Sequence, residues 1–210
     1  MPFAADHFLP ALAARIRRAA DANGRALVAI DGRSLAGKTQ LATELVGHLG
    51  PTGSILAVDS YFEPLNDPKT TPVAERLWRL RFDELKAALG SLTAGEPVRH
   101  APYDWERDHV RPETVIKPGI VLVEGLGALR SELCGFYEYA IWVEGHHATQ
   151  IDRIIAREGR RYLDLWVGQW LPLEEAYIAA EKPWKAADLY VAGADITISE
   201  VGAQLLASDP

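Results

Sequence analysis

The stretch GRSLAGKT, residues 32–39, decides the fold. It fits the pattern G-x-x-x-x-G-K-[ST] at every fixed position. A short apolar run rich in branched residues, RALVAID at 25–31, precedes it, and a helical pattern, TQLATELVGHL at 39–49, follows it. Glycines in such a loop let backbone N–H groups curl around phosphate oxygens, and the following helix points the positive end of its dipole at them. A strand, this loop and a helix in succession predict a nucleotide-binding loop rather than a plain connecting turn.

Each polar side chain of the loop has a predicted task. Lys38 supplies positive charge at the β- and γ-phosphates, and the hydroxyl of Thr39 is a ligand for Mg²⁺. The motif by itself does not separate a kinase from a GTPase or a motor ATPase, so other residues must tell which phosphate moves. The residues expected to bind the nucleotide are Gly32, Arg33, Ser34, Leu35, Ala36, Gly37, Lys38, Thr39 and Gln40.

Strand and helix patterns alternate along the rest of the chain. After residues 25–31, the strand candidates are 54–59, 119–125, 139–145 and 195–200, and helical patterns separate most of them. Nearly continuous apolar strands that alternate with helices predict a mostly parallel sheet covered on both faces. We therefore expect an α/β protein with a three-layer fold and a mostly parallel, five-stranded sheet.

The chain of 210 residues is long enough to bury one sizeable core, so we expect one domain spanning residues 1–210. Its predicted parts are an N-terminal helix within 1–24, an acceptor-binding insertion at about 60–115, and a small helical lid region at about 146–185.

The composition limits the partners. A net charge of −7 argues against nucleic acid as the main partner, because proteins that bind the phosphate backbone usually carry a basic excess. No stretch is long and apolar enough to cross a bilayer, and the N-terminus lacks the pattern of a secretion signal. Cys134 is the only cysteine, which fits a reducing compartment. We expect a cytosolic protein with no membrane or nucleic-acid partner, and leave a homo-oligomer open.

Two carboxylates lie at the ends of predicted strands. Asp59 ends the candidate strand 54–59, and Glu124 lies near the end of 119–125. The carboxyl ends of parallel strands meet the ligand crevice, where a carboxylate can accept a proton from an attacking hydroxyl or help to order Mg²⁺. On position alone, Asp59 fits a helix cap or turn equally well. Glu124 stands where an aspartate is commoner, which is compatible with contact to the metal through water.

Further motifs follow in order, and together they resemble the uridine kinase family, which belongs with phosphoribulokinase and pantothenate kinase. GRSLAGKT (32–39) resembles the family's nucleotide loop and DSYF (59–62) its acid-serine-aromatic segment. FDELKAAL (82–89) and GEPVRHAPYDW (95–105) resemble a helix followed by the Pro-x-Tyr-Asp-aromatic stretch. VLVEGLGAL (121–129) and KAADLYVAGAD (185–195) resemble two later strands. The resemblance covers about residues 26–195.

The resemblance implies a phosphotransferase with an alcohol group as acceptor. It would transfer the γ-phosphoryl group of ATP to a hydroxyl of a nucleoside or similar small molecule, with Mg²⁺ as cofactor. Asp59 is implied as the general base, and Asp104 as a structural residue. The implied metal ligands are Thr39, Asp59 and Glu124, and the implied substrate-binding residues are Tyr103, His109, Arg111 and Glu124.

The lid is expected in HHATQIDRIIAREGRR, residues 146–161. Arg153 and Arg157 are four residues apart, so on a helix both reach the same side. This pair resembles the family's lid arginines, which embrace the transferred phosphoryl group, and joins Lys38 and Asp59 as candidate catalytic residues. Arg160 and Arg161 extend the basic patch, although a solvated helix face is the alternative interpretation.

Two tryptophans follow at the same spacing. Trp166 and Trp170 predict an aromatic stripe on one helix face, which favours core or lid packing over a platform for base stacking.

The acceptor half departs from the family pattern. Pyrimidine-nucleoside members carry an acidic residue before the Phe-Asp pair, but VAERLWRLRFD (73–83) has none at the matching place. His109 is displaced by one residue from the family's histidine. The acceptor, including uridine itself, is therefore open, as is the choice between ATP and GTP. Two alternatives remain: a nucleoside monophosphate kinase, and a regulatory P-loop NTPase that hydrolyses ATP or GTP with a protein partner.

Overall fold

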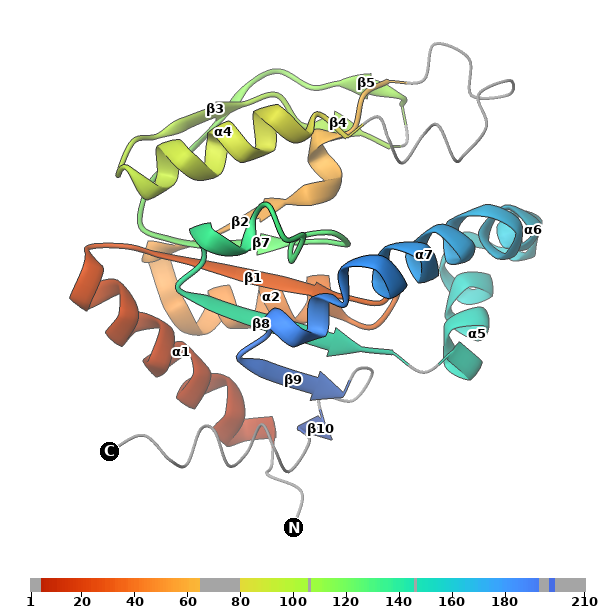
Figure 1. Cartoon of the computed structure of the whole chain (residues 1–210), viewed down its shortest axis with the longest axis horizontal. Helices are drawn as coiled ribbons and strands as arrows, with labels where there is room; N and C mark the ends of the chain where they lie inside the picture. The colour runs from red at the N-terminus through yellow and green to blue at the C-terminus, as the bar shows by residue number, and fades with distance from the viewer. Residues whose placement is uncertain (1–4, 65–79, 106, 146, 193–196, 199–210) are drawn as a thin grey trace.

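The computed structural model describes residues 5–64, 80–105, 107–145, 147–192 and 197–198 (Figure 1). The described α-helices are α1 (Ala5–Asn23), α2 (Lys38–Leu49), α4 (Phe82–Thr93), α5 (His147–Glu158), α6 (Leu163–Leu165) and α7 (Leu171–Glu181). The strands are β1 (Ala26–Gly32), β2 (Gly53–Ala57), β3 (Val98–His100), β4 (Tyr103–Asp104), β5 (His109–Val110), β6 (Thr114–Ile116), β7 (Ile120–Glu124), β8 (Tyr139–Glu144), β9 (Leu189–Ala192) and β10 (Thr197–Ile198). Short helical turns are η1 (Gly50–Thr52), η2 (Val58–Tyr61), η3 (Cys134–Phe136), η4 (Arg160–Tyr162), η5 (Trp166–Trp170) and η6 (Pro183–Ala186). Within these described ranges, the helices are too short or too polar to span a bilayer.

The central sheet has the strand order β2-β7-β1-β8-β9, with β10 added at one edge. Neighbours among the first five strands are all parallel, whereas β10 runs antiparallel to β9. The prediction of an α/β fold with a mostly parallel, five-stranded sheet is therefore confirmed. Strand β1 lies in the middle, with parallel neighbours on both sides, so the loop that follows it begins where connections leave in both directions.

The fifth parallel strand is not where the sequence pattern put it. We expected it at 195–200, but β9 occupies Leu189–Ala192, and of the expected range only Thr197–Ile198 is described as strand, antiparallel to β9. Leu189 and Val191 are almost completely buried against the sheet. The alternating β-branched residues of 195–200 gave the stronger strand pattern, but it was the burial of Leu189 and Val191 that determined the pairing with β8.

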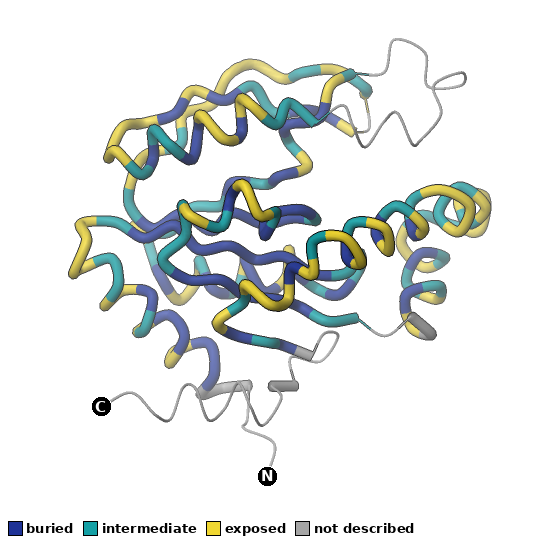
Figure 2. The backbone as a smooth tube through the Cα atoms, in the orientation of Figure 1, coloured by how far each residue is buried: buried dark blue, intermediate teal, exposed yellow. Residues whose placement is uncertain are grey.

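Alternate side chains of β1 enter two different cores. Val28 and Ile30 pack in the core that includes α1 and α2, whereas Leu27 and Ala29 pack in the core that includes α4 and η3. All four side chains are fully buried. Figure 2 shows the buried strands between covering layers. The period-two pattern of a strand covered on both faces therefore produces the three-layer arrangement.

We call residues 80–116 the insertion. They lie beyond β2, the edge strand of the sheet next to β7 (Figure 1). They comprise α4 and two small antiparallel sheets, β3 with β6 and β4 with β5. Helix α4 buries Leu85, Leu89 and Leu92 in the core on its side of the central sheet. The insertion is thus fixed to the sheet by apolar packing close to the end of β2.

His100, at the end of β3, holds the segment that carries Asp59. Its ring Nε2 lies 2.7 Å from Oγ of Ser60, and its ring stacks on Tyr61 with centroids 4.0 Å apart. Arg81 donates to the carbonyl oxygen of Ser60 from the other side. His100 is only 5% exposed. Burial, assisted by the charge of Arg81, lowers the pKa of His100 to about 4, so the neutral ring belongs to the native packing.

Residues 147–181, which we call the lid segment, run from α5 through η4, α6 and η5 into α7. The backbone stays helical from Leu163 to Glu181, with one π-helical turn at Trp166–Trp170. Such turns often occur at functional sites. Figure 1 shows α7 returning across the sheet from the outer end of this segment.

The lowered pKa of His100, at the end of β3, predicts that the stability of the protein depends on pH. An unfolded histidine has a pKa of 6.5, whereas that of native His100 is about 4, so between these values protons bind preferentially to the unfolded chain. The free energy of unfolding therefore falls as the pH is lowered through this window, by an expected loss on the order of 2 kcal/mol at pH 5. Urea unfolding at pH 8 and pH 5 measures it.

His100→Gln should remove this part of the pH dependence. His109→Gln, at an exposed position of β5, is the matched control and should retain it. The same fall in stability in wild type and His100→Gln would show that other groups cause it.

Candidate active site

Two glycines shape the loop between β1 and α2. Gly32 has φ 151°, and a Cβ at this position would lie 2.0 Å from the carbonyl oxygen of Val143 on β8, so no larger residue fits. Gly37 has φ 101° and stands directly before α2. The N–H of Leu41 donates to the carbonyl oxygen of Gly37 at 2.9 Å, so the helix begins at the loop. The first turn of a helix has N–H groups without intrahelical partners, which suits phosphate binding at this loop.

Lys38, Thr39 and Glu124 meet at the end of this loop. Nζ of Lys38 donates to the carbonyl oxygens of Gly32 and Arg33 at 3.0 and 2.9 Å, which holds its charge over the loop. The hydroxyl of Thr39 donates to Oε1 of Glu124 at 3.2 Å. Burial raises the pKa of Glu124, and Lys38 opposes the rise. Two of the three predicted metal ligands are therefore in direct contact.

Asp59 follows β2 in the turn η2, two residues beyond Ala57, which is paired with Glu124 in the sheet. Asp59 is exposed to water, yet the surrounding protein displaces enough solvent to raise the pKa of its carboxyl group. Lys38 from the loop and Arg157 from the lid segment oppose this rise through their charges. Asp59 thus lies within electrostatic reach of both predicted cationic groups.

The two predicted lid arginines border the phosphate loop. Nη1 of Arg153 donates to the carbonyl oxygen of Leu35 at 2.7 Å. The guanidinium of Arg157 pairs with Glu158 at 2.8 Å and lies 6.0 Å from the ring centre of Trp166. A cavity of about 420 Å³ lies between α5 and the loop, and it is lined by Leu35, Gly37, Gln40, Arg153, Ala156 and Arg157. The predicted loop and the predicted arginines therefore share one cavity.

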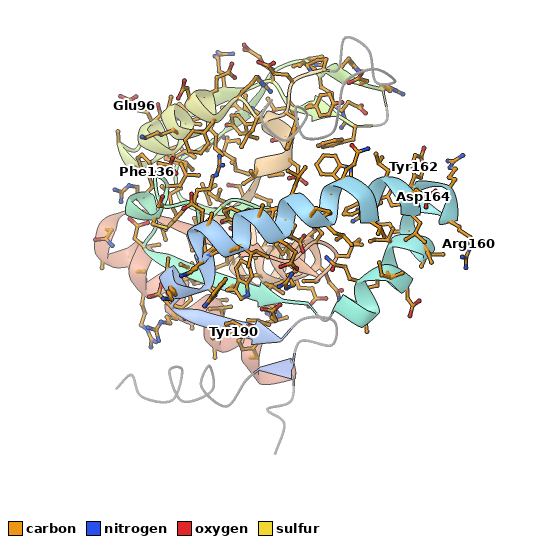
Figure 3. All side chains as sticks on the ribbon, turned by 45° about the vertical axis from the view of Figure 1, so that its right-hand side comes forward. Glu96, Phe136, Arg160, Tyr162, Asp164 and Tyr190 are labelled. Atoms are coloured by element: carbon orange, nitrogen blue, oxygen red, sulfur yellow. The ribbon has the colours of Figure 1, made fainter. Side chains whose placement is uncertain are left out.

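Arg160 and Arg161 do not extend this cationic lining. Figure 3 shows Arg160, Tyr162 and Asp164 at the outer end of the lid segment, with Arg160 directed away from the body of the protein. Arg161 is exposed and stacks on the ring of Tyr162 at 4.8 Å. For these two arginines the alternative interpretation, a solvated helix face, is the one that fits.

The residues predicted to bind the acceptor lie in β4, in β5 and just after it. Tyr103 is buried, and its hydroxyl donates to Asp108. Asp104 is also buried and accepts from the guanidinium of Arg111 at 2.8 Å, which fits its expected structural role. His109 is exposed. A role of Tyr103, His109 and Arg111 in binding the acceptor stays a prediction.

A chain of aromatic rings connects the insertion to the lid segment. Trp105 lies 5.0 Å from Phe62, 4.9 Å from Tyr103 and 6.2 Å from Trp170, measured between ring centres. Trp170 in turn lies 6.2 Å from Trp166. The indole N–H of Trp105 donates to the backbone carbonyl of Asp59 at 3.3 Å. The spacing of Trp166 and Trp170 predicted their contact, but their link to Trp105 comes from residues far apart in sequence.

Asp31 was missed by the sequence reasoning. It is fully buried at the end of β1 and accepts hydrogen bonds from the N–H groups of Gly127 and Leu129 at 3.2 and 2.8 Å. The hydroxyl of Tyr177 donates to it at 2.7 Å. Burial raises the pKa of Asp31, and the bond from Tyr177 opposes the rise most strongly. An acid that ends an otherwise apolar strand directly before the glycine loop was the available signal.

Glu174 was missed as well. It is 1% exposed, although it lies on a helix next to the phosphate loop, and its Oε2 accepts from the N–H of Ser34 at 2.6 Å. The signal was weak, because the sequence LPLEEAYIAAE does not tell which of Glu174 and Glu175 faces inward.

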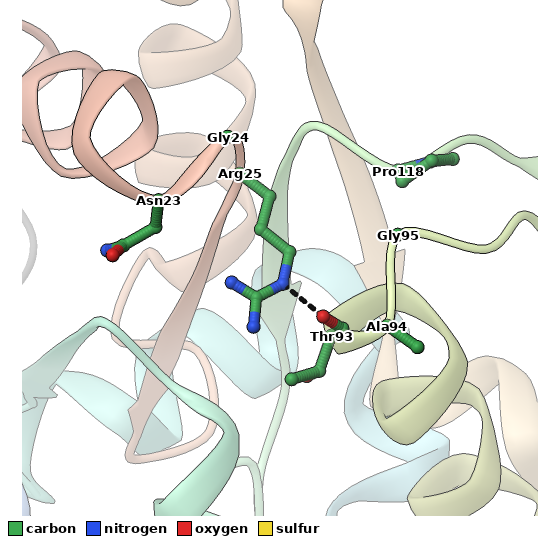
Figure 4. Close-up of a pocket in the computed structure, with 7 residues that line it drawn as sticks. All are labelled: Asn23, Gly24, Arg25, Thr93, Ala94, Gly95 and Pro118. Carbon is green, nitrogen blue, oxygen red and sulfur yellow. Dashed lines mark hydrogen bonds between the residues drawn. The ribbon is translucent and has the colours of Figure 1, made fainter.

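A wider hollow of about 530 Å³ lies at the opposite ends of the strands, where β1 and β7 begin (Figure 4). Arg25 lies in it, and its guanidinium donates to the carbonyl oxygen of Thr93 and pairs with Glu138 at 3.1 Å. None of the predicted catalytic residues lines it. We therefore place the candidate site at the smaller cavity beside the phosphate loop.

The residues at this cavity fit a nucleotide with Mg²⁺. The described residues contain no group of three or more His, Cys, Asp or Glu side chains that could enclose a metal ion by themselves. Mg²⁺ does not need one, because it commonly binds one or two carboxylates together with phosphates and water. The contact between Thr39 and Glu124 provides such a partial ligand set beside the loop.

Comparison with known proteins adds a relative and two similar folds. A search against protein-family models found no match. A curated uridine kinase from Halobacterium salinarum is 28% identical over 173 residues, which cover 74% of this chain and 75% of the relative.

Two solved structures share the fold. One, named a possible uridine kinase from Bacillus stearothermophilus, has a TM-score of 0.62 at 19% identity and covers 85% of this chain and 98% of its own. The other, from Silicibacter sp. TM1040, is provisionally named a fructose transport system kinase. It has a TM-score of 0.60 at 19% identity, with coverage of 95% and 94%. The curated relative supports a kinase function, and the two solved structures share its type of fold. The resemblance to uridine kinase-like P-loop kinases, which the ordered motifs indicated, is confirmed over most of the chain.

Proposed function

We propose that the protein is an ATP-dependent kinase that transfers the γ-phosphoryl group to a hydroxyl of a small molecule, with a nucleoside or a similar metabolite as the acceptor. The observation that carries the proposal is the position of Asp59. Its carboxylate lies within electrostatic reach of Lys38 in the phosphate loop and of Arg157 in the lid segment. A carboxylate between these two cations can accept a proton from a hydroxyl that attacks the γ-phosphorus.

The proposed reaction is an in-line displacement. The carboxylate of Asp59 accepts the proton of the acceptor hydroxyl as its oxygen forms a bond to the γ-phosphorus. The bond from phosphorus to the β–γ bridging oxygen breaks, and its electron pair leaves with ADP. Desolvation raises the pKa of Asp59, which strengthens it as a proton acceptor, and the charges of Lys38 and Arg157 oppose this rise.

Charge neutralisation is the other task of the site. Lys38, held over the loop by two carbonyl oxygens, places a positive charge where the phosphates bind. Arg153 and Arg157 add charge from the opposite wall of the cavity. Thr39 and Glu124 would hold Mg²⁺, which when bound neutralises charge on the phosphate oxygens. Asp59 is the third candidate ligand, and its substitution below separates that role from the role of the base.

The acceptor belongs on the side of Asp59 that faces the insertion. Tyr103 and Trp105 come from β4 and the residue after it, and Trp105 contacts the backbone of Asp59 directly. Aromatic walls beside a general base favour an acceptor that has an apolar or ring-shaped part as well as a hydroxyl.

A direct test is an acceptor screen. Purified protein with ATP and Mg²⁺ is incubated with nucleosides, nucleoside monophosphates, sugars and pantothenate, and ADP release is measured. We expect release that depends on one class of hydroxyl acceptor. ADP release that needs a nucleoside monophosphate would favour a nucleoside monophosphate kinase. Hydrolysis at the same rate without any acceptor would contradict the proposal and favour a regulatory NTPase.

Replacement of the proposed base separates two roles of Asp59. Asp59→Asn keeps the shape but cannot take up the hydroxyl proton, so we expect kcat to fall at least about 100-fold while the Kd for ATP changes little. Turnover and nucleotide affinity are measured on the same preparation. Asp164→Asn, at the exposed outer end of the lid segment, is the control and should leave both unchanged. A comparable loss of ATP affinity in Asp59→Asn would mean that Asp59 mainly holds the metal.

A further inference from the structure

Glu174 is a buried charge whose partners come from separate parts of the chain. Oε2 accepts from the N–H of Ser34 in the phosphate loop at 2.6 Å, and Oε1 accepts from Nε2 of Gln150 on α5 at 3.0 Å. The guanidinium of Arg33 lies 3.6 Å from Oε1. With 1% of its surface exposed, this carboxylate depends on these donors, because an ionised group without partners is very costly to bury.

Gln150 contacts both the phosphate loop and Glu174. Its Nε2 also donates to the carbonyl oxygen of Ser34 at 3.1 Å, so one amide bonds both the loop and α7. A reversed amide would put Oε1 against two acceptor oxygens, so the hydrogen-bond pattern fixes its orientation. Gln150 is 3% exposed, and its Oε1 has no hydrogen-bond partner among the described residues. The unpaired oxygen is a cost that the two donated bonds must offset.

The position of Gln150 determines which way α5 faces. Gln150, Arg153 and Arg157 are spaced i, i+3 and i+7, so they share one face of the helix. The contact of Gln150 with Ser34 therefore turns both arginines toward the phosphate loop. The bond from Arg153 to the carbonyl oxygen of Leu35, one turn further along, is consistent with this orientation.

The next turn of α7 contacts the end of β1. Tyr177, three residues after Glu174, donates to Asp31 at the end of β1. Two successive turns of α7 thus contact the end of β1 and the loop that follows it. Glu175, in contrast, is half exposed and pairs with the guanidinium of Arg33 at the surface.

We propose that Glu174 is a positioning residue: through Ser34 and Gln150 it holds the lid segment in register with the phosphate loop, so that Arg153 and Arg157 face the bound nucleotide. The inference rests on the proposed binding of ATP at this loop. Glu174 itself acts on the nucleotide only through Ser34 and α5.

Nucleotide binding tests this role without an acceptor. Glu174→Gln replaces one acceptor oxygen by a donor and cannot satisfy Ser34 and Gln150 together. We expect the Kd for ATP with Mg²⁺ to rise about tenfold or more, whereas Glu175→Gln, the same change one residue on, stays within about twofold of wild type. A folded Glu174→Gln protein that binds ATP within about twofold of wild type would overturn the proposal.

A double-mutant cycle distinguishes positioning from a general loss of packing. Arg153→Ala should weaken ATP binding in the wild-type background but add little in the Glu174→Gln background, because the arginine is already displaced there. Losses that multiply in the double variant would show that the two residues act independently. If Glu174→Gln does not fold, Gln150→Ala replaces it in the cycle, since it releases α5 and leaves Glu174 paired with Ser34 and Arg33.

Hydrogen exchange of the ligand-free protein provides a readout that does not depend on the kinase proposal. Amides of 147–158 should exchange faster in Glu174→Gln than in wild type and Glu175→Gln. Unchanged exchange would refute the positioning role even in a protein that binds no nucleotide. If the wild type does not bind ATP but Glu174→Gln still exchanges faster, the proposed function is contradicted. The positioning role of Glu174 is then still supported.

Discussion

The carboxylate of Asp31 fixes the geometry on which the rest of the site depends. It lies at the end of the central strand, without contact to water, and accepts hydrogen bonds from Gly32, from Gly127 and Leu129 in the segment after β7, and from Tyr177 on α7. One side chain thereby sets the distance between the phosphate loop, the neighbouring strand end that carries Glu124, and the helix that closes the lid segment. A buried polar group of this kind is costly unless its hydrogen-bond partners stay in place, so the arrangement is strongly specified.

Local sequence patterns predicted the donor half of the site well. The loop at 32–39, Glu124 at the end of β7 and Asp59 just beyond β2 could be identified, because the carboxyl ends of parallel strands all lie on the same side of a sheet. Arg153 and Arg157 could be paired from helical spacing alone. The fifth strand was misplaced, because a β-branched pattern at 195–200 says nothing about which segment packs against β8.

Contacts between distant segments could not be predicted in this way. The bond between Glu174 and Ser34 joins residues 140 positions apart, and no local pattern shows whether Glu174 or Glu175 points inward. The same holds for Trp105, which reaches the backbone of Asp59 and the ring of Trp170 from a different part of the chain. Residues 73–79, in the stretch where the acid of the acceptor pattern is missing, lie outside the described residues.

The tether between Gln150 and Glu174 has a topological consequence. It joins residues 24 positions apart and turns the intervening chain into a closed ring with a fixed base. While this bond holds, the two ends of the ring stay together, and the exposed side chains of Tyr162 and Val167 lie at its far end.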